Sequence, residues 1–570
     1  MGGSSGSASP ARPTSPWPLA EALLSTATFE FATTARSTAI VAALIVVVLG
    51  VLSAVTVALA VVGDPGWWFA AVPMLGLFGL AVRDLVQRRH SILRNYPVLG
   101  HLRFALEAIR PEIQQYFIES DEGGAPFPRA TRNVIYERSK GIHGEKAFGT
   151  ELDVGAVGYE FLLHSNHPAP QLQDHPRVRI GGPDCTKPYD MALLNVSAMS
   201  FGALSPNALR ALNRGAALGG FAHDTGEGGL SEYHLENGGD LVWEIGSGYF
   251  GCRTSKGDFD AAAFAEKSAN PSVRMVELKL SQGAKPGIGG VLPGAKVTQE
   301  IADVRGVPVG EKCVSPAAHK VFSTPRELVL FMARFRELAD GKPAGFKLCV
   351  GSRAQLLAIC KAMVAEGVTP DFIVVDGSEG GTGAAPLEFE DNVGTPLTDG
   401  LILMHNALVG CGLRDRIRLG ASGKVATGTD LVKRLAQGAD FTNAARAMMM
   451  AVGCIQAQVC HTNRCPVGVA TQDPKRGRAV DVADKSVRVQ RYQQATIDQA
   501  LQLVSAMGLA GPDALGPQHL MRRIDHVNVR SYRDLYEWLQ PGELLDGPPE
   551  GWATDWQRAD PDSFVEGAVP

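Results

Sequence analysis

The stretch DFIVVDGSEGGTG, residues 371–383, joins an apolar run to a glycine-rich turn. The run from Phe372 to Val375 is short and rich in β-branched and aromatic residues, and it ends at the polar Asp376. Such a run predicts a buried strand. The glycines after it predict a loop whose bare backbone approaches a ligand.

Short runs of the same kind recur from about residue 190, separated by amphipathic helix-like stretches. This alternation predicts a parallel sheet, and eight repeats over roughly 260 residues match an α/β fold of the (β/α)8 or TIM-barrel type. A Rossmann sheet is the rival, but no GxGxxG turn follows an early strand with an acidic residue beyond it. The eight predicted strands are Ala192–Met199, Gly220–His223, Met275–Leu280, Lys312–Val314, Gly345–Val350, Asp371–Val375, Ile417–Gly420 and Asp440–Ala444.

The stretch CIQAQVCHTNRCPVGVATQ, residues 454–472, gathers Cys454, Cys460 and Cys465 in one short loop. Thiolates at this spacing can converge on one soft metal centre, and the Cys-Pro ending recurs in iron–sulfur loops. Three ligands argue against a closed structural zinc site, which takes four. The sequence favours a cluster with three cysteine ligands. Three free, partly buried cysteines are the alternative.

Composition excludes several classes of protein. The net charge of −5 gives no reason to expect a nucleic-acid partner. Nine cysteines, none before Cys185, lack a disulfide-like rhythm and suit a reducing compartment. The counts of 64 glycines and 35 prolines indicate many tight turns between strands and helices.

Residues 37–90 predict a transmembrane helical hairpin behind a polar, disordered tail at 1–36. The runs 38–62 and 66–82 are apolar, and a span needs about 20 such residues. Basic residues flank the outer ends of both runs, while the short connecting loop carries one aspartate. The positive-inside rule therefore predicts a multi-pass protein of the inner (cytoplasmic) membrane with its barrel in the cytoplasm. A late signal peptide is the alternative, but the first run is long for one.

The rest of the chain divides into three predicted parts. Residues 91–185 form an N-terminal preface packed on the barrel, residues 186–530 form the barrel, and residues 531–570 form a Pro/Gly/Asp-rich tail. Since the sequence shows no nucleotide-binding domain, we expect the electron donor to be external.

Barrel chemistry sits at the C-terminal ends of the strands. The glycine-rich loops after the sixth and seventh predicted strands, beside the end of the eighth, form the usual barrel site for a phosphate. Four donors at the middle of the mouth would suit a flavin, although a lysine on a strand that pairs with a carboxylate is the alternative. The predicted cofactor-binding residues are Ala198, Met199, Ser200, Lys279, Gln282, Lys347, Ser378, Gly380, Gly381, Thr382, Gly383, Ser422, Gly423, Lys424, Ala445 and Arg446, with Lys285 as the fourth donor.

Over about residues 150–530 the chain resembles the FMN-binding synthase domain of glutamate synthases, and more closely the short, membrane-attached members of that family. The motifs SAMSFGALS, TGEGG, KLSQGAKPG and GGTGA and the cysteine loop occur in family order. The resemblance implies FMN beside a [3Fe-4S] cluster on Cys454, Cys460 and Cys465. It also implies that the catalytic residues Glu227, Gln282, Lys285 and Arg305 surround 2-oxoglutarate or its imine.

The resemblance implies reductive amination of 2-oxoglutarate, through 2-iminoglutarate, to glutamate. Lys285 and Arg305 suit the two carboxylates of that substrate. Glu227 suits the binding or deprotonation of ammonia; a carboxylate that caps the next helix is the alternative. Electrons are expected from an external donor such as ferredoxin or a quinone.

Departures from the family pattern concern the substrate more than the flavin. The typical KPGEGG reads KPGIGG here, so Ile288 replaces an acid. No cysteine precedes Cys185, so we expect no glutaminase domain and an outside source of ammonia. A flavin oxidoreductase acting on another 2-oxo acid, amine or hydroxy acid, coupled to a membrane quinone, is the second hypothesis. A redox-sensing or scaffolding membrane protein is the third.

Overall fold

The computed structural model describes residues 35–142 and 144–566, which divide into two compact units, Met1–Glu119 and Ser120–Pro570. The predicted tail at 1–36 lies almost wholly outside the described residues. The elements of the first unit are α2 (Ala35–Val62), η1 (Pro65–Trp67), α3 (Trp68–Val86), α4 (Ser91–Asn95), α5 (Gly100–Ile113) and η2 (Gln114–Ile118).

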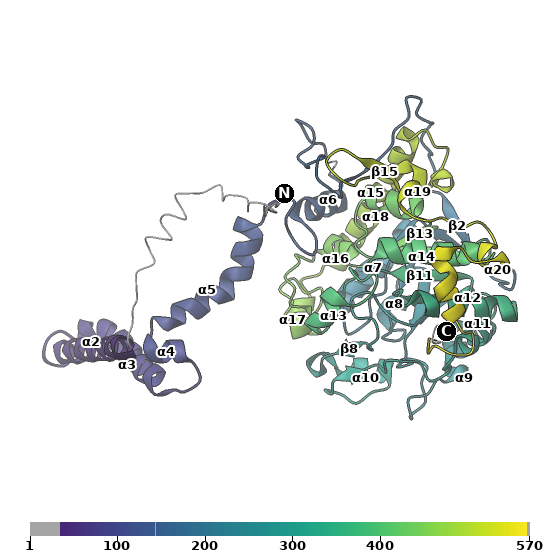
Figure 1. The fold of residues 1–570 in the computed structure, drawn as a ribbon. Coiled ribbons are helices and arrows are strands. Elements are labelled where there is room, and N and C mark those ends of the chain that lie inside the picture. The colour runs from purple at the N-terminus through teal and green to yellow at the C-terminus, as the bar shows by residue number, and fades with distance from the viewer. Residues whose placement is uncertain (1–34, 143, 567–570) are drawn as a thin grey trace, which may run out of the picture. The chain divides into compact units, whose positions relative to one another are not determined.

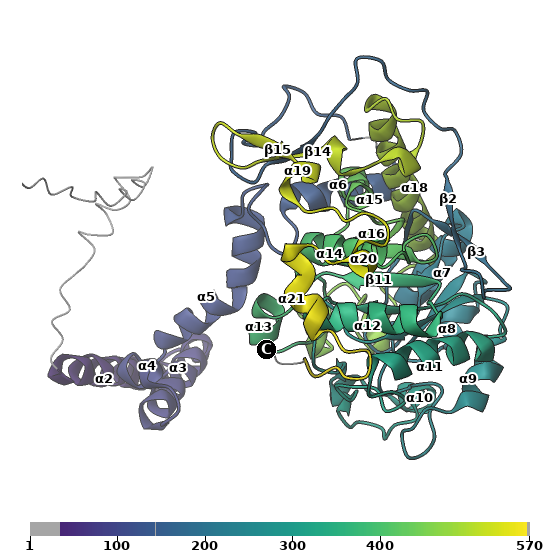
Figure 2. The same cartoon turned by 45° about the vertical axis from the view of Figure 1, so that its right-hand side comes forward.

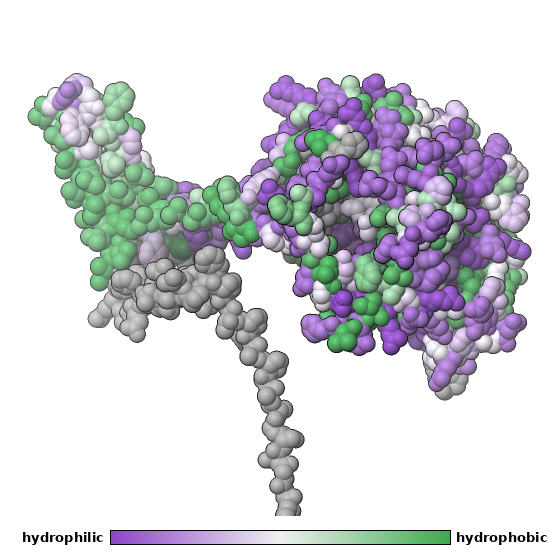
Figure 3. Space-filling view, turned by 90° about the horizontal axis from the view of Figure 1, so that it is seen from above, coloured by the Kyte–Doolittle hydropathy of each residue, from purple (hydrophilic) through white to green (hydrophobic). Residues whose placement is uncertain are grey.

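Helices α2 and α3 pack on one another as a hairpin. Asp64 closes the turn, because its Oδ1 accepts a hydrogen bond from the Gly66 N–H at 2.8 Å and Pro65 begins the next helical turn. Both helices are long and apolar enough to cross a membrane by length and composition alone. Figure 3 shows the apolar surface that they expose. The predicted hairpin is confirmed as a fold, and its insertion in a membrane stays a prediction.

The second unit is built on a closed barrel of eight parallel strands, which confirms the predicted fold class (Figures 1 and 2). Strand β4 pairs with β5 and, on its other side, with β13, so the last strand closes on the first. In chain order the strands are β4 (Leu194–Val196), β5 (His223–Asp224), β6 (Leu241–Ile245), β7 (Val273–Lys279), β10 (Ala344–Leu348), β11 (Phe372–Asp376), β12 (Arg418–Ser422) and β13 (Phe441–Ala444).

One of the eight predicted strands was wrong. Lys312–Val314 is not in the barrel: Cys313–Val314 forms β9, which pairs antiparallel with β8 (Val291–Leu292) in the segment after β7. The barrel strand that prediction missed is β6, whose five residues are all buried. The sequence of β6, LVWEI, places a glutamate among apolar residues, although the whole strand is buried. Val314 in β9 is instead half-exposed. Both runs are short and apolar enough to form strands, and they differ in burial, which the sequence does not show.

Helices surround the barrel, and α18 packs along α7, α6 and α15. The hairpin of β2 (Arg177–Ile180) and β3 (Tyr189–Ala192) leads into β4, and its Ile180 and Met191 pack against residues inside the barrel. The helices of this unit include α6 (Arg129–Lys140), α7 (Pro206–Gly219), α8 (Glu232–Leu235), α9 (Ala261–Ser268), α10 (Gln299–Arg305), α11 (Pro325–Leu338), α12 (Arg353–Glu366), α13 (Leu387–Asn392), α14 (Leu397–Gly410), α15 (Gly428–Ala436), α16 (Arg446–Val452), α17 (Pro474–Gly477) and α18 (Val482–Ala506).

The segments flanking the barrel differ from the predicted preface and tail. The boundary between the units falls inside the predicted preface, so residues 91–119 belong with the hairpin and the remainder with the barrel. The segment 531–570 contains helices whose Leu544 and Trp552 are buried, and α21 packs on α12. The remaining elements are β1 (Glu160–Leu162), β14 (Leu520–Arg523), β15 (Val529–Ser531), α19 (Tyr532–Leu535), α20 (Glu543–Asp546), α21 (Glu550–Arg558) and the 3-10 turns η3 (Gly294–Lys296), η4 (Cys460–Thr462), η5 (Pro512–Ala514) and η6 (Pro517–His519).

Candidate functional site

The loop after β4 opens the candidate site with Ala198, Met199 and Ser200. The buried Arg305, at the end of α10, holds this loop, because its Nη2 donates to the Phe201 carbonyl at 2.9 Å and to Ser200 Oγ at 3.2 Å. The guanidinium is therefore already engaged by the protein. The structure gives Arg305 the contacts of a loop anchor rather than those of a free substrate cation.

Glu227, from the loop after β5, meets the end of β7. Its Oε1 lies 3.1 Å from Lys279 Nζ, which also donates to Gln282 Oε1 at 2.8 Å. Ser315, which sequence reasoning missed, donates to Glu227 Oε2 at 3.2 Å. Burial raises the pKa of Glu227, but the charge and hydrogen bond of Lys279, with other nearby cations, bring it below its ordinary value. Glu227 is an ionised acceptor at neutral pH.

Lys285 belongs to the same group of charges. Its side chain is 2% exposed and its Nζ donates to the Ala384 carbonyl at 2.7 Å. Burial, and then the neighbouring Lys279, lower the pKa of Lys285 to about 8, against the opposing pull of Glu227. The amine therefore sits close to its titration point at neutral pH, where it can carry or release a proton.

Lys347 lies apart from these residues, in the barrel interior. Its Nζ pairs with Glu244, and it also lies 3.4 Å from Glu277 Oε1 and 4.0 Å from Asp224 Oδ2. Burial opposes the charge of Lys347, but the three carboxylates raise its pKa well above the ordinary value. Burial and Glu244 raise the pKa of Asp224 to about 7. The salt-bridge alternative therefore describes Lys347 better than the predicted flavin contact.

The predicted phosphate corner depends on a glycine at position 381. A Cβ built on Gly381 would lie 2.8 Å from the Cδ and Nε atoms of Arg446. Arg446 in turn donates from Nη2 to the Glu379 carbonyl at 2.5 Å. A side chain at position 381 would force the Arg446 side chain to shift, and the loop after β11 and the end of β13 bring a cation and bare backbone together.

The loops after β7 and β11 also touch. A Cβ on Gly283 would lie 1.7 Å from the Gly377 carbonyl, and the Gly283 N–H donates to Asp376 Oδ2 at 2.7 Å. The structure thus brings the KLSQGAKPG and GGTGA loops side by side. Lys424, a predicted cofactor residue, is exposed. The others of this corner lie in the loop after β11, at the end of β12 and just after it, and at the N-cap of α16; they are Ser378, Gly380, Thr382, Gly383, Ser422, Gly423 and Ala445.

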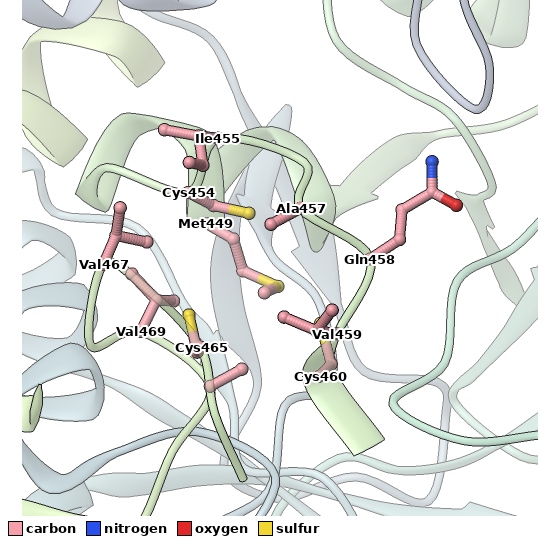
Figure 4. Close-up of a pocket in the computed structure, with 11 residues that line it drawn as sticks. Met449, Cys454, Ile455, Ala457, Gln458, Val459, Cys460, Cys465, Val467 and Val469 are labelled. Atoms are coloured by element: carbon pink, nitrogen blue, oxygen red, sulfur yellow. The ribbon is translucent and has the colours of Figure 1, made fainter. Parts of the chain in front are cut away.

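The three cysteines of the loop after α16 line one recess, together with apolar side chains (Figure 4). The Gln456 N–H points to Cys454 Sγ at 3.4 Å, and Gln456 and Gln458 have positive φ angles of 58° and 54°. Burial raises the pKa of Cys454 to about 12, against the hydrogen bond from the Gln456 N–H and with smaller contributions from Cys460 and Cys465. Three soft donors in an apolar recess fit a cluster, since metal binding removes the thiol protons.

The cysteine loop is fastened to the loop after β4. Lys296 Nζ donates to the Ala203 carbonyl at 2.7 Å and to the Cys460 carbonyl at 3.3 Å. Gln472 Nε2 donates to the Gly202 and Leu204 carbonyls at 3.1 and 2.6 Å. The link through Gln472 joins the two loops directly, and Lys296 bridges them from η3, so the cysteine loop lies next to the loop that follows a barrel strand.

A second support comes from the segment before α6, to which the sequence assigned no chemistry. Gln456 Oε1 accepts from the Phe127 N–H at 3.2 Å, and Gln456 Nε2 donates to the Phe127 carbonyl at 3.1 Å. Tyr136 donates its hydroxyl to the Cys454 carbonyl at 2.8 Å. These partners are more than 300 residues apart in the chain, and for this reason no local motif reveals them.

The family model described as the conserved region in glutamate synthase matches residues 183–510. The chain belongs to the glutamate synthase family. It is 37% identical over 500 residues to the glutamate synthase large subunit-like protein YerD of Bacillus subtilis, covering 80% of this chain and 95% of YerD. It is 34% identical over 320 residues to the archaeal-type glutamate synthase [NADPH] of Thermotoga neapolitana, covering 56% of this chain and 60% of that protein. The chain is thus a glutamate synthase-like oxidoreductase.

Among solved structures, a flavocytochrome b2 mutant with pyruvate bound aligns with 82% of this chain and 95% of its own at 13% identity and a TM-score of 0.37. A mandelate oxidase mutant with (S)-mandelic acid aligns with 76% of this chain and 99% of its own at 14% identity and a TM-score of 0.39. At these values the likeness says nothing about the site.

Proposed function

We propose that this protein uses FMN and a [3Fe-4S] cluster to aminate 2-oxoglutarate reductively to glutamate, with electrons from an external donor. The observation that carries the proposal is the link through Lys296 and Gln472 between the cysteine loop and the loop after β4. Electron transfer from a cluster to a flavin requires short separation, and adjoining loops provide it. Family membership supports the same reaction.

The polar groups at the mouth fit an FMN. The close approach of Gly381 to Arg446 suits the phosphate, and Lys279 and Gln282 offer donors for the ring. FMN, when bound, would supply the hydride for the imine carbon. The cluster, on Cys454, Cys460 and Cys465, would supply electrons one at a time.

The residues around Glu227 would bind the amine partner. Because Lys279 keeps the pKa of Glu227 below its ordinary value, the carboxylate is charged at neutral pH and accepts hydrogen bonds from ammonia or an imine N–H. A low pKa also makes it a weak base, so we assign Glu227 to binding and orientation rather than to proton removal.

Lys285 would meet the substrate as a cation. With a pKa of about 8, it is mostly protonated at pH 7 and loses its charge as the pH rises through that value. Binding of a dicarboxylate would therefore weaken on the alkaline side. Arg305 would act on the substrate through Ser200, which it positions.

The test is one detergent-purified sample assayed for flavin type, iron content and turnover of 2-oxoglutarate with ammonia and dithionite. We expect FMN, an electron-paramagnetic signal from a three-iron cluster, and glutamate. Lys285→Met should raise the KM for 2-oxoglutarate about 100-fold at pH 7. Lys285→Arg should keep its charge at higher pH, so the loss of substrate binding on the alkaline side of the pH profile should move to higher pH. A colourless, iron-free preparation from well-supplied cells would refute the proposal.

A second candidate keeps both cofactors but takes another 2-oxo acid, amine or hydroxy acid and exchanges electrons with a membrane quinone. The α2–α3 hairpin favours it, because soluble ammonia assimilation has no need of two spans. We place the hairpin in the inner membrane, with the barrel in the cytoplasm, on the basis of flanking arginines. Reduction by a quinol analogue, with no glutamate formed from 2-oxoglutarate and ammonia, would select this candidate.

A further inference from the structure

Helix α5 carries a continuous apolar stripe that no described residue of the first unit covers. From Leu99 to Ile109 its members recur at intervals of three and four residues, which places them on one face of a helix, and Tyr116 and Phe117 continue the stripe into η2. All are largely exposed, from 49% for Ile109 to 85% for Phe117. The stripe consists of Leu99, Leu102, Leu106, Ile109, Tyr116 and Phe117.

This helix is fixed to the end of the hairpin. Asp84, in the last turns of α3, is 1% exposed, and its Oδ2 accepts from the Val98 N–H at 3.0 Å and lies 2.9 Å from His101 Nε2. The ring of Phe104 also meets the ring of His90 edge-on, with centroids 5.4 Å apart. The start of α5 therefore has a defined position relative to the C-terminal end of α3.

The surroundings of the stripe are cationic. Between α3 and the end of α5 the exposed charged residues are mostly arginines, and Arg103 and Arg110 flank the stripe on the helix surface. The exposed acids of this stretch are few, and one of them, Glu107, is paired with Arg103 at 3.0 Å. The exposed arginines are Arg83, Arg88, Arg89, Arg94, Arg103 and Arg110.

We propose that α5 lies in the headgroup region of an anionic membrane, with its stripe toward the acyl chains and its arginines on lipid phosphates. An apolar face flanked by arginines is the pattern of an interfacial helix. Figure 3 shows apolar surface continuing from the hairpin along α5. The inference rests on the proposed membrane insertion of α2 and α3 and adds a second, interfacial contact.

The test uses the full chain in vesicles of phosphatidylglycerol and phosphatidylethanolamine whose acyl chains carry bromine as a quencher. An environment-sensitive fluorescent amino acid replaces Leu106 in the stripe, Ala108 on the opposite face, or Val47 in the middle of α2. We expect quenching at 106 to exceed quenching at 108 by about two-fold or more. In phosphatidylcholine vesicles the excess should shrink.

The three positions separate the possible failures. Strong quenching at 47 with equal quenching at 106 and 108 would overturn the interfacial helix and leave the hairpin intact. Absence of quenching at 47 would overturn the hairpin itself. An excess at 106 that is the same in phosphatidylcholine would refute the assignment of the arginines to anionic headgroups.

Discussion

Gly381 leaves room for the Arg446 side chain beside the loop after β11, and a methyl group at this position would take up that room. We expect Gly381→Ala to push the Arg446 side chain away, since Cβ would lie 2.8 Å from its Cδ, and to weaken flavin retention about ten-fold or more. Gly351→Ala, in the loop after β10 and outside the predicted cofactor residues, is the matched control, because a Cβ there meets no atom within 4 Å. Titration of the deflavinated variants with FMN measures the affinity of each for the flavin. Equal affinities would remove Arg446 from the phosphate site.

Lys347 is the cation that lies beside three buried carboxylates, so its removal should be costly. We expect Lys347→Met to destabilise the folded barrel by about 3–5 kcal/mol, because it leaves Glu244 and Glu277 without a cation. Lys424→Met, at an exposed position, should change stability little. Denaturant unfolding of both variants measures the difference. If Lys347→Met unfolds like the parent while losing flavin, the lysine serves the cofactor instead.

At the scale of elements, the support of the cysteine loop by the segment before α6 gives a further prediction. Gln456→Ala removes two hydrogen bonds to Phe127, so the loop should hold iron less firmly and the cluster signal should change shape. Gln458→Ala, which loses one exposed hydrogen bond to Ala125, is the control. Iron analysis after gel filtration, with electron paramagnetic resonance, distinguishes them. Identical iron content and spectra would deny Gln456 a positioning role.

Much of the fold follows from the sequence, because apolar runs and glycine turns are local signals. Seven predicted strands correspond to barrel strands, and the three cysteines line one recess, while the cluster on them stays a prediction. Strand β6 escaped detection because Glu244 interrupts its apolar pattern, and that same residue forms the ion pair with Lys347. Contacts such as that of Gln456 with Phe127 join distant segments, so only the folded chain reveals them.

At the scale of the whole molecule, the division at Glu119 predicts that the barrel unit folds without the hairpin. A chain starting at Ser120 keeps the whole core cluster around the barrel, including the buried Phe127 and Ile135. We expect it to be soluble without detergent and to hold iron and flavin as the full chain does. Size-exclusion chromatography and absorbance spectra test this. Aggregation of the shorter chain would show that the hairpin contributes to folding.

If the proposed cofactors are bound, the two bridges from Lys296 and Gln472 would give the metal centre and the flavin pocket a common wall. In cells short of iron, the cysteine loop would lack its cluster and would support the loop after β4 less well. Binding of the flavin would then depend on earlier assembly of the cluster. Chains that hold a flavin but no cluster would accordingly be rare.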